Sequence, residues 1–222
     1  MPARTVYSER PKEHAFTYAY AQPDEYHFCL DSIIFAYFLS RQFPTPPEGS
    51  QEFRAIDLCA GCGVVGLELS YYLDWIRHFD FLEIQPVFRE SFEANLEITN
   101  KSNRDYQFLE AHFNALHSET LRETYDLIVA NPPYFRPLEG HASPNQVRQR
   151  ARFFESATPS ELFRAVESGL KPGGRAYLLV RPGEPHGRDL ETELKACLSE
   201  RCEWSFPAEV RGTWVLEIRK RD

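Results

Sequence analysis

The stretch DLCAGCGVVG, residues 57–66, decides the fold class of this chain of 222 residues. It follows a short apolar run and leads into a helical pattern, and Gly61, Gly63 and Gly66 stand at the G-x-G-x-x-G spacing. Glycines at such a turn let the backbone bend sharply and let a ligand approach closely. The start of the following helix offers free N–H groups to that ligand. The stretch therefore predicts a strand, a ligand-binding turn and a helix.

Strands and helices alternate along the rest of the chain. Strands are predicted over residues 54–60, 79–84, 106–110, 125–130, 175–180, 202–206 and 214–219. Helices are predicted over residues 31–43, 64–73, 86–99, 160–170 and 189–198. This alternation is typical of an α/β fold in which helices cover both faces of a mainly parallel sheet. We therefore predict a Rossmann-like, doubly wound, seven-stranded sheet that ends in an antiparallel C-terminal strand pair.

A linker rich in proline, residues 44–49, divides the chain into two predicted parts. An N-terminal segment, residues 1–43, precedes it, and a core domain, residues 50–222, follows it. Parallel sheets bind ligands beyond the carboxyl ends of their strands. The residues that follow the predicted strands of the core domain are therefore the candidates for function.

Two carboxylates accompany the glycine turn. Glu83 ends the second predicted strand, 20 residues beyond Gly63, where a carboxylate can accept hydrogen bonds from both hydroxyls of a ribose. Asp57 lies inside the first strand, where a buried carboxylate needs partners and could orient the turn or reach an amino group of the ligand. A nicotinamide cofactor and S-adenosylmethionine both carry a ribose, so Glu83 predicts an adenosine-containing ligand. Asp57 favours S-adenosylmethionine, because dehydrogenases normally have an apolar residue there.

The fourth predicted strand ends in NPPYF, residues 131–135. Two consecutive prolines fix φ twice and remove two N–H donors. The side-chain oxygen of Asn131 and the carbonyl of Pro132 could then accept both hydrogens of a planar –NH2 group, while Tyr134 stacks on its ring. Accepting these hydrogens localises the nitrogen lone pair, so methyl transfer needs positioning and no strong base. The alternative is a rigid turn whose aromatic residues belong to a core.

Charge and cysteine usage limit the function classes. The net charge is −8, of which residues 1–130 carry −10 and residues 131–222 carry +2. Four arginines of the second part are candidate phosphate contacts: Arg136, Arg148, Arg150 and Arg152. Cys59-x-x-Cys62 lacks a second pair at zinc spacing, which favours free thiols and no metal. No export signal or membrane-spanning run is visible, so we expect a cytoplasmic protein without a membrane partner.

These motifs resemble those of class I S-adenosylmethionine-dependent methyltransferases of the Asn-Pro-Pro-Tyr type, over roughly residues 26–183. Within that group the chain looks most like bacterial tRNA adenine-N6 methyltransferases that modify the base next to the anticodon of a valine tRNA. The narrower likeness lies in residues 26–34, 131–135 and 140–152. It implies an RNA partner, a tRNA above all, and a chain that acts as a monomer.

The resemblance also implies roles for individual residues. The residues expected to bind S-adenosylmethionine are His27, Asp57, Cys59, Gly61, Gly63, Glu83, Ile84, His112, Phe113 and Asn131. The expected catalytic residues are Asn131, Pro132, Pro133 and Tyr134. The residues expected to contact the RNA are Tyr134, Phe135, Arg136, Arg148, Arg150 and Arg152. His112 stands where such enzymes often carry an Asp, and the N-terminal helix is expected to cover the cofactor.

Other functions stay open at the level of the sequence. A protein glutamine amide also presents a planar –NH2 group, although enzymes of that type usually carry a separate N-terminal domain, for which the roughly 50 residues before the core are too few. Another nucleic-acid amine, at N6 of adenine or N4 of cytosine, fits the same motif. Asp57 and the double proline count against a nicotinamide-dependent oxidoreductase. Asn131 and the intact glycine turn count against a non-catalytic binding module.

Overall fold

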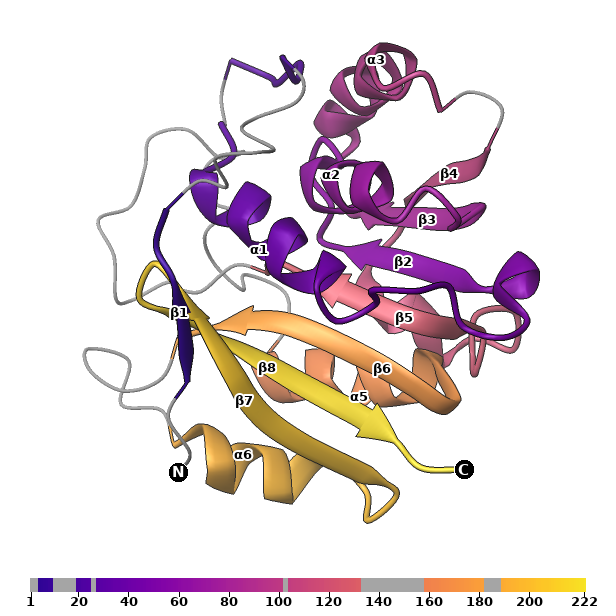
Figure 1. Ribbon diagram of the computed structural model, residues 1–222. Coiled ribbons are helices and arrows are strands. Elements are labelled where there is room, and N and C mark those ends of the chain that lie inside the picture. The colour runs from indigo at the N-terminus through magenta and orange to yellow at the C-terminus, as the bar shows by residue number, and fades with distance from the viewer. Residues whose placement is uncertain (1–3, 10–18, 25–26, 102–103, 133–157, 182–188) are drawn as a thin grey trace.

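The computed structural model describes residues 4–9, 19–24, 27–101, 104–132, 158–181 and 189–222 (Figure 1). Strands in these ranges form one sheet in the order β1-β7-β8-β6-β5-β2-β3-β4. Their bounds are β1 Thr5–Tyr7, β2 Arg54–Leu58, β3 His78–Glu83, β4 Asp105–Glu110, β5 Tyr125–Ala130, β6 Leu170–Val180, β7 Cys202–Val210 and β8 Thr213–Lys220. Neighbouring strands run parallel, except that β8 is antiparallel to both β6 and β7.

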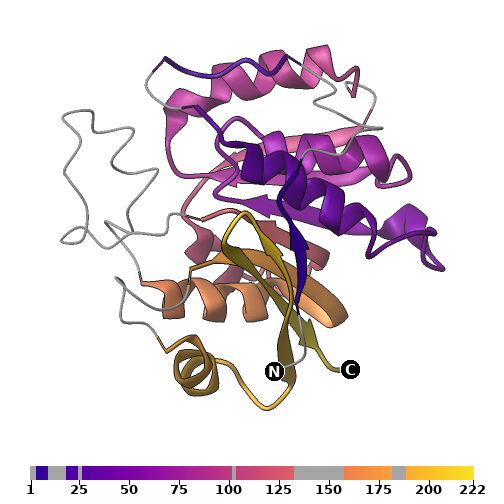
Figure 2. The ribbon, with the colours of Figure 1, turned by 60° about the vertical axis from the view of Figure 1, so that its left-hand side comes forward.

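Helices cover both faces of this sheet (Figures 1 and 2). One layer contains α1 (Leu30–Ser40), α2 (Val64–Tyr72) and α3 (Arg89–Ile98). The opposite layer contains α5 (Pro159–Gly169) and α6 (Leu190–Cys197). Short 3-10 turns complete the described elements: η1 Ser50–Glu52, η2 Pro86–Phe88 and η3 Phe113–His117. Within the described ranges, no helix combines the length and the apolar character needed to cross a membrane.

The central strands are buried on both faces. In β5, Leu127 and Val129 pack in the layer of α1 to α3, whereas Ile128 and Ala130 pack in the layer of α5 and α6. Successive side chains of a strand point to opposite faces, so both sets are removed from water. This double burial explains why the strand reads as one apolar run and not as an alternating pattern.

The predicted Rossmann-like α/β architecture is confirmed, and each predicted strand is present. The strand number was wrong by one, because β1 adds an eighth strand, parallel to β7, at the edge of the sheet. Its three residues are too few to show a periodicity in the sequence. β6 also begins earlier than predicted, at Leu170, because residues 171–174 form an irregularity inside the strand and not a separate loop.

α1 belongs to the same core as the sheet. It ends at Ser40, earlier than predicted, and its residues Ile33, Ile34 and Phe35 are fully buried in the cluster that includes β5. Its first turn lies at the carboxyl ends of the central strands, since an ion pair of 3.1 Å joins Asp31 to Arg211 in the β7–β8 turn. The N-terminal segment is thereby held beside the residues that follow the strands.

Candidate active site

The register of the sheet brings the predicted site residues together. β2 and β5 are parallel neighbours in which Leu58 pairs with Ala130, so the glycine turn and Asn131 leave the sheet side by side. β3 and β4 continue the row, with Glu83 paired to Glu110 at their ends. The residues predicted from four separate stretches of sequence therefore follow four adjacent strands, β5, β2, β3 and β4.

The three glycines of the turn serve different purposes. Gly61 has a φ of 54° and Gly63 a φ of 82°, in the left-handed region that favours glycine. A Cβ on Gly63 would lie 2.7 Å from the ring of Phe92, and one on Gly66 would lie 2.5 Å from the ring of Phe81. Gly63 is therefore required by the close approach of α3 to the start of α2, and Gly66 by the close packing of α2 on β3. A Cβ on Gly61 would meet the ring of Phe88 only at an ordinary contact distance of 3.9 Å.

Asp57, in β2, is hydrogen-bonded to the glycine turn that follows this strand. Its Oδ2 accepts a hydrogen bond of 2.9 Å from the backbone N–H of Gly66, which agrees with the role of orienting the turn. The residue is 1% exposed, and Oδ1 has no hydrogen-bond partner among the described residues. Burial away from water raises the pKa of Asp57 to about 8. The carboxyl group therefore holds a proton at neutral pH.

Glu83 joins the end of β3 to the glycine turn. Its Oε2 accepts from the N–H of Gly61 at 3.0 Å, and its Oε1 accepts from the N–H of Gln85 at 2.9 Å. Burial raises the pKa of Glu83, and these backbone hydrogen bonds oppose the rise. Each carboxylate oxygen has a second lone pair, so ribose hydroxyls could still bind. The next residue, Ile84, is 50% exposed and places an apolar surface beside the carboxylate.

His112 follows β4 at the same edge of the sheet. It caps η3, and its Nδ1 accepts a hydrogen bond of 3.2 Å from the N–H of Asn114. Partial burial lowers the pKa of His112, so the neutral ring carries its hydrogen on Nε2. The ring of Phe113 lies 4.1 Å from it, centroid to centroid, and is itself buried in the core. Phe113 thus packs against the ring of His112.

Asn131 contacts the N-terminal segment. Its Nδ2 donates a hydrogen bond of 3.1 Å to Oγ of Ser32 in α1, and Pro132 beside it is buried. The same segment is fastened to the glycine turn by Asn95 of α3, which donates to the carbonyl oxygens of Ala21 and Cys62 at 3.0 and 2.9 Å. Asn95 also accepts from the N–H of Ala21 at 2.6 Å.

Sequence reasoning did not single out Ser32 or Asn95. Asn95 carries a usable signal, because it follows Phe92 by one helical turn and is fully buried with it on the inner face of α3. A polar residue on an apolar face needs buried partners. Ser32 carries no such signal, because its partner is 99 positions away.

The cysteines at the turn are protonated thiols. Burial raises the pKa of Cys59 well above its ordinary value and that of Cys62 to about 12. Metal ligation and nucleophilic attack both require the thiolate. In the part of the chain that the structure describes, no group of three or more His, Cys, Asp or Glu side chains could hold a metal ion.

Some of the predicted residues are not placed at the site. His27 lies on the segment that leads into α1, and its side chain is exposed. The following predicted residues lie outside the described ranges: Pro133, Tyr134, Phe135, Arg136, Arg148, Arg150 and Arg152. Their roles at the site stay predictions.

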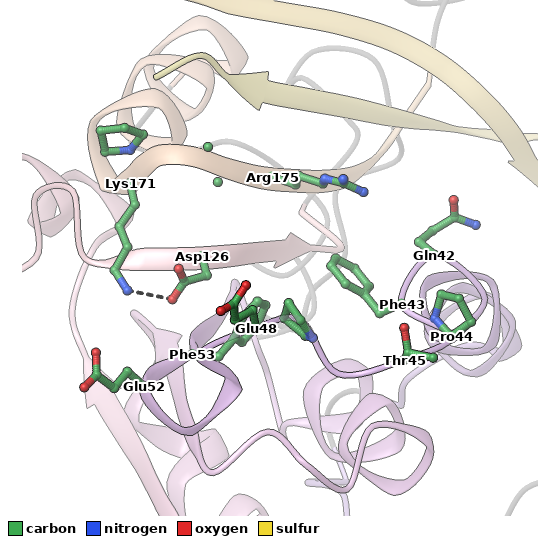
Figure 3. Close-up of a pocket in the computed structure, with 15 residues that line it drawn as sticks. Gln42, Phe43, Pro44, Thr45, Glu48, Glu52, Phe53, Asp126, Lys171 and Arg175 are labelled. Carbon is green, nitrogen blue, oxygen red and sulfur yellow. Dashed lines mark hydrogen bonds and ion pairs between the residues drawn. The ribbon is translucent and has the colours of Figure 1, made fainter.

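A cavity of about 660 Å³ lies at the other end of the sheet, beside the amino ends of β5 and β6 (Figure 3). On its wall Nζ of Lys171 donates to Oδ2 of Asp126 at 2.7 Å, and the same oxygen accepts from the N–H of Arg54 at 2.8 Å. These charges already have partners, and open α/β sheets bind ligands at the carboxyl ends of their strands. The candidate site is therefore the row formed by the glycine turn, Glu83, His112 and Asn131.

Comparisons with known proteins concern the family and the fold of the chain. A family model described as the methyltransferase small domain matches residues 36–201. A tRNA1(Val) (adenine(37)-N6)-methyltransferase of Yersinia pestis is 28% identical over 133 residues, which is 59% of this chain and 51% of that protein. The chain thus spans about half the length of the curated relatives it matches.

Solved structures share the fold at low sequence identity. One is described as a predicted O-methyltransferase from Agrobacterium tumefaciens, with a TM-score of 0.56 and 18% identity over 84% of this chain and 81% of that one. Another is the 16S rRNA N2 G1207 methyltransferase of Thermus thermophilus, in complex with AdoMet and guanosine. Its TM-score is 0.54, with 21% identity over 86% of this chain and 43% of that one. At such identities the likeness concerns the fold alone.

Proposed function

Because the chain belongs to the methyltransferase small domain family, we propose that it transfers the methyl group of S-adenosylmethionine to N6 of an adenine in RNA. The observation that carries this proposal is the position of Asn131. Its amide follows β5 directly beside the glycine turn, since Leu58 and Ala130 are paired in the sheet. Asn131, which would accept hydrogen bonds from the amine, and the glycine turn, which would bind the methyl donor, therefore lie at the same edge of the sheet.

The residues of this edge fit S-adenosylmethionine. Gly61 has a left-handed φ of 54°, the Glu83 carboxylate can accept from ribose hydroxyls, and the second oxygen of Asp57 has no partner among the described residues. Ile84 would pack against the adenine, and Nε2 of His112 would donate to a ring nitrogen. When bound, the cofactor supplies an electrophilic methyl group on a sulfonium. The 16S rRNA methyltransferase of Thermus thermophilus, whose fold is similar, was solved in complex with AdoMet.

Asn131 and Pro132 would prepare the substrate amine. The lone pair of an exocyclic amine is delocalised into the ring, so the nitrogen is a weak nucleophile. The Asn131 side-chain oxygen and the Pro132 carbonyl would accept its two hydrogens and draw the lone pair out of conjugation. The remaining contribution is orientation, because reacting atoms held in line react far faster than free ones. The proton leaves after transfer, when the nitrogen has become acidic, so no strong base is needed.

The description of a relative supports an adenine in RNA as the proposed substrate. The matched Yersinia pestis protein is described as acting on adenine 37 of tRNA1(Val). An adenine must be unstacked before its amino group can enter such an edge, which suits a single-stranded loop. Tyr134 would then stack on the base, and Arg136, Arg148, Arg150 and Arg152 would contact phosphates, as the sequence predicts.

Labelled S-adenosylmethionine tests the proposal. The purified protein is incubated with total tRNA, with rRNA and with a release-factor protein, and nucleoside mass spectrometry identifies any methylated base. We expect N6-methyladenosine in tRNA. Label in a glutamine of the release factor would replace the RNA substrate with a protein amide. Label in none of the three would refute the proposed substrate.

A further inference from the structure

Ser32 touches the side chain on which the proposed reaction depends. Its Oγ accepts the hydrogen bond of 3.1 Å from Nδ2 of Asn131, and only 4% of the serine is exposed. We propose that Ser32 is a positioning residue that orients the Asn131 amide for the amine of the substrate. This inference rests on the proposed function, since it concerns the same site.

The chemistry of an amide makes its orientation decisive. Asparagine has a donor end at Nδ2 and an acceptor end at Oδ1, and the two ends are nearly equal in size. With Nδ2 held by Ser32, Oδ1 points in another direction and can serve as the acceptor for a substrate –NH2 group. Turned over, the amide of Asn131 would present its own donor hydrogens to that amine. Two donors cannot bond, so only one orientation supports the reaction. A serine hydroxyl both donates and accepts, so the contribution of Ser32 is to fix the position of the Asn131 side chain through this contact.

Ser32 is well placed to fix the position of the Asn131 side chain. Its backbone N–H donates to the carbonyl of Cys29 in the first turn of α1. The preceding residue, Asp31, is tied to Arg211 by the ion pair across the sheet, and the following residue, Ile33, is fully buried. The hydroxyl therefore comes from a backbone that is fixed on both sides. A fixed partner lowers the loss of rotational freedom when the substrate binds.

The same contact links the two parts of the chain. α1 precedes the linker rich in proline, and Asn131 directly follows β5. Asn95 makes the corresponding link at the glycine turn, through Ala21 and Cys62. The two contacts serve different partners, because Asn95 holds the turn on which the cofactor would lie. Loss of the Ser32 hydroxyl should therefore affect the chemical step and spare cofactor binding.

A double-mutant cycle tests the role of Ser32. Single-turnover rates are measured with labelled S-adenosylmethionine for the intact chain, Ser32→Ala, Asn131→Ala and the double variant. We expect Ser32→Ala to lower the rate roughly tenfold, because a misplaced reacting group loses part of the orientation effect. In the Asn131→Ala background, the same change should alter the rate less than twofold, because its target is gone. The Kd for S-adenosylmethionine should stay within twofold throughout.

Two further variants distinguish an effect of the Ser32 hydroxyl on Asn131 from a general effect on packing. Ser32→Thr keeps the hydroxyl and should recover most of the rate. Ser70→Ala removes an equally buried hydroxyl, which donates to Leu67 inside α2, and should leave the rate unchanged. A tenfold fall from Ser32→Ala that persists without Asn131 would overturn the proposal, and so would an unchanged rate. A loss of cofactor affinity that matches the fall in rate would also overturn it.

The cycle stays informative if the proposed substrate is wrong. Should a protein amide and not an RNA adenine accept the label, the adenine proposal fails and the cycle is run on that amide. Non-additivity between Ser32 and Asn131 would then still support the positioning role. Full additivity with an adenine substrate would refute the role of Ser32 and leave the proposed function standing.

Discussion

Acidic side chains at the two ends of the sheet differ in their burial and in their partners. At the carboxyl end, Asp57 and Glu83 are almost fully buried, burial raises the pKa of each, and Oδ1 of Asp57 has no partner among the described residues. At the amino end, Asp126 accepts from both Lys171 and the backbone of Arg54, and water reaches the ion pair. Both ends are lined by polar residues, and Arg54 at the amino end also has a buried Nε without a partner among the described residues. The two ends differ because the carboxyl end buries two acidic side chains whose pKa values are raised, whereas the acid at the amino end is paired with a lysine.

This contrast shows why a cavity alone does not identify a site. The cavity at the amino end is open and polar (Figure 3), yet its acid and base neutralise each other. Buried acidic side chains with raised pKa values are typical of functional sites, and here they lie at the carboxyl end. Variants at each end should therefore have different effects, and four of them test the comparison.

The largest effect is expected from Asn131→Ala. Removal of a polar contact made in the transition state should lower turnover by about a hundredfold or more. Cofactor binding should survive, because the glycine turn and Glu83 are untouched. Steady-state rates and calorimetric titration with S-adenosylmethionine check this. A loss of cofactor affinity as large as the loss of rate would remove Asn131 from the role of amine acceptor.

The next effect concerns the stability of the buried Asp57. Its pKa is about 8 in the folded chain and near 4 in an unfolded chain. Between these values the folded chain binds more protons, so the contribution of Asp57 to stability falls as pH rises from about 4 to about 8. Asp57→Asn keeps the shape of the protonated group and removes the titration. The intact chain should therefore lose about 3 kcal/mol relative to this variant between pH 5 and pH 7.

Urea unfolding at pH 5 and pH 7 measures that difference. The comparison between the two proteins cancels all groups that titrate equally in both. A difference that stays constant with pH would mean that Asp57 is ionised in the folded chain. The carboxyl end would then lose one of the features that distinguish it from the amino end.

A smaller effect is expected from Glu83→Gln. Loss of the charge weakens hydrogen bonds from ribose hydroxyls, and the Kd for S-adenosylmethionine should rise roughly tenfold. Glu52→Gln, at the cavity of the amino end, is the matched control and should leave the Kd unchanged. Equal changes in the two variants would abolish the proposed difference between the ends of the sheet.

The smallest effect is expected at the amino end itself. Asp126→Asn weakens one ion pair and one hydrogen bond near the surface and should lower the free energy of unfolding by about 1 kcal/mol. Methyl transfer should keep its rate, because the change lies at the far end of β5. Denaturant unfolding and a rate measurement together check this. A clear fall in rate would indicate that the cavity takes part in function.

Much of this arrangement could be predicted from the sequence. The glycine turn, Glu83 and Asn131 each follow a short apolar run, and the rule that parallel strands carry ligands at their carboxyl ends places all three on one edge. The eighth strand could not be predicted, because β1 has only three residues and pairs with a strand some 200 positions away. The packing role of Gly63 could not be predicted either, since the sequence does not show that the ring of Phe92 lies against it.

The sequence by itself determined the fold class, the order of the elements and the chemical types gathered at the site. It did so because these depend on local periodicity and on short motifs, which neighbours in the chain specify. Only the tertiary structure decided that Asp57 holds Gly66, that Glu83 holds Gly61 and that Ser32 holds Asn131. Such contacts depend on packing between residues distant in the chain, and burial among them raises the pKa of the two carboxyl groups.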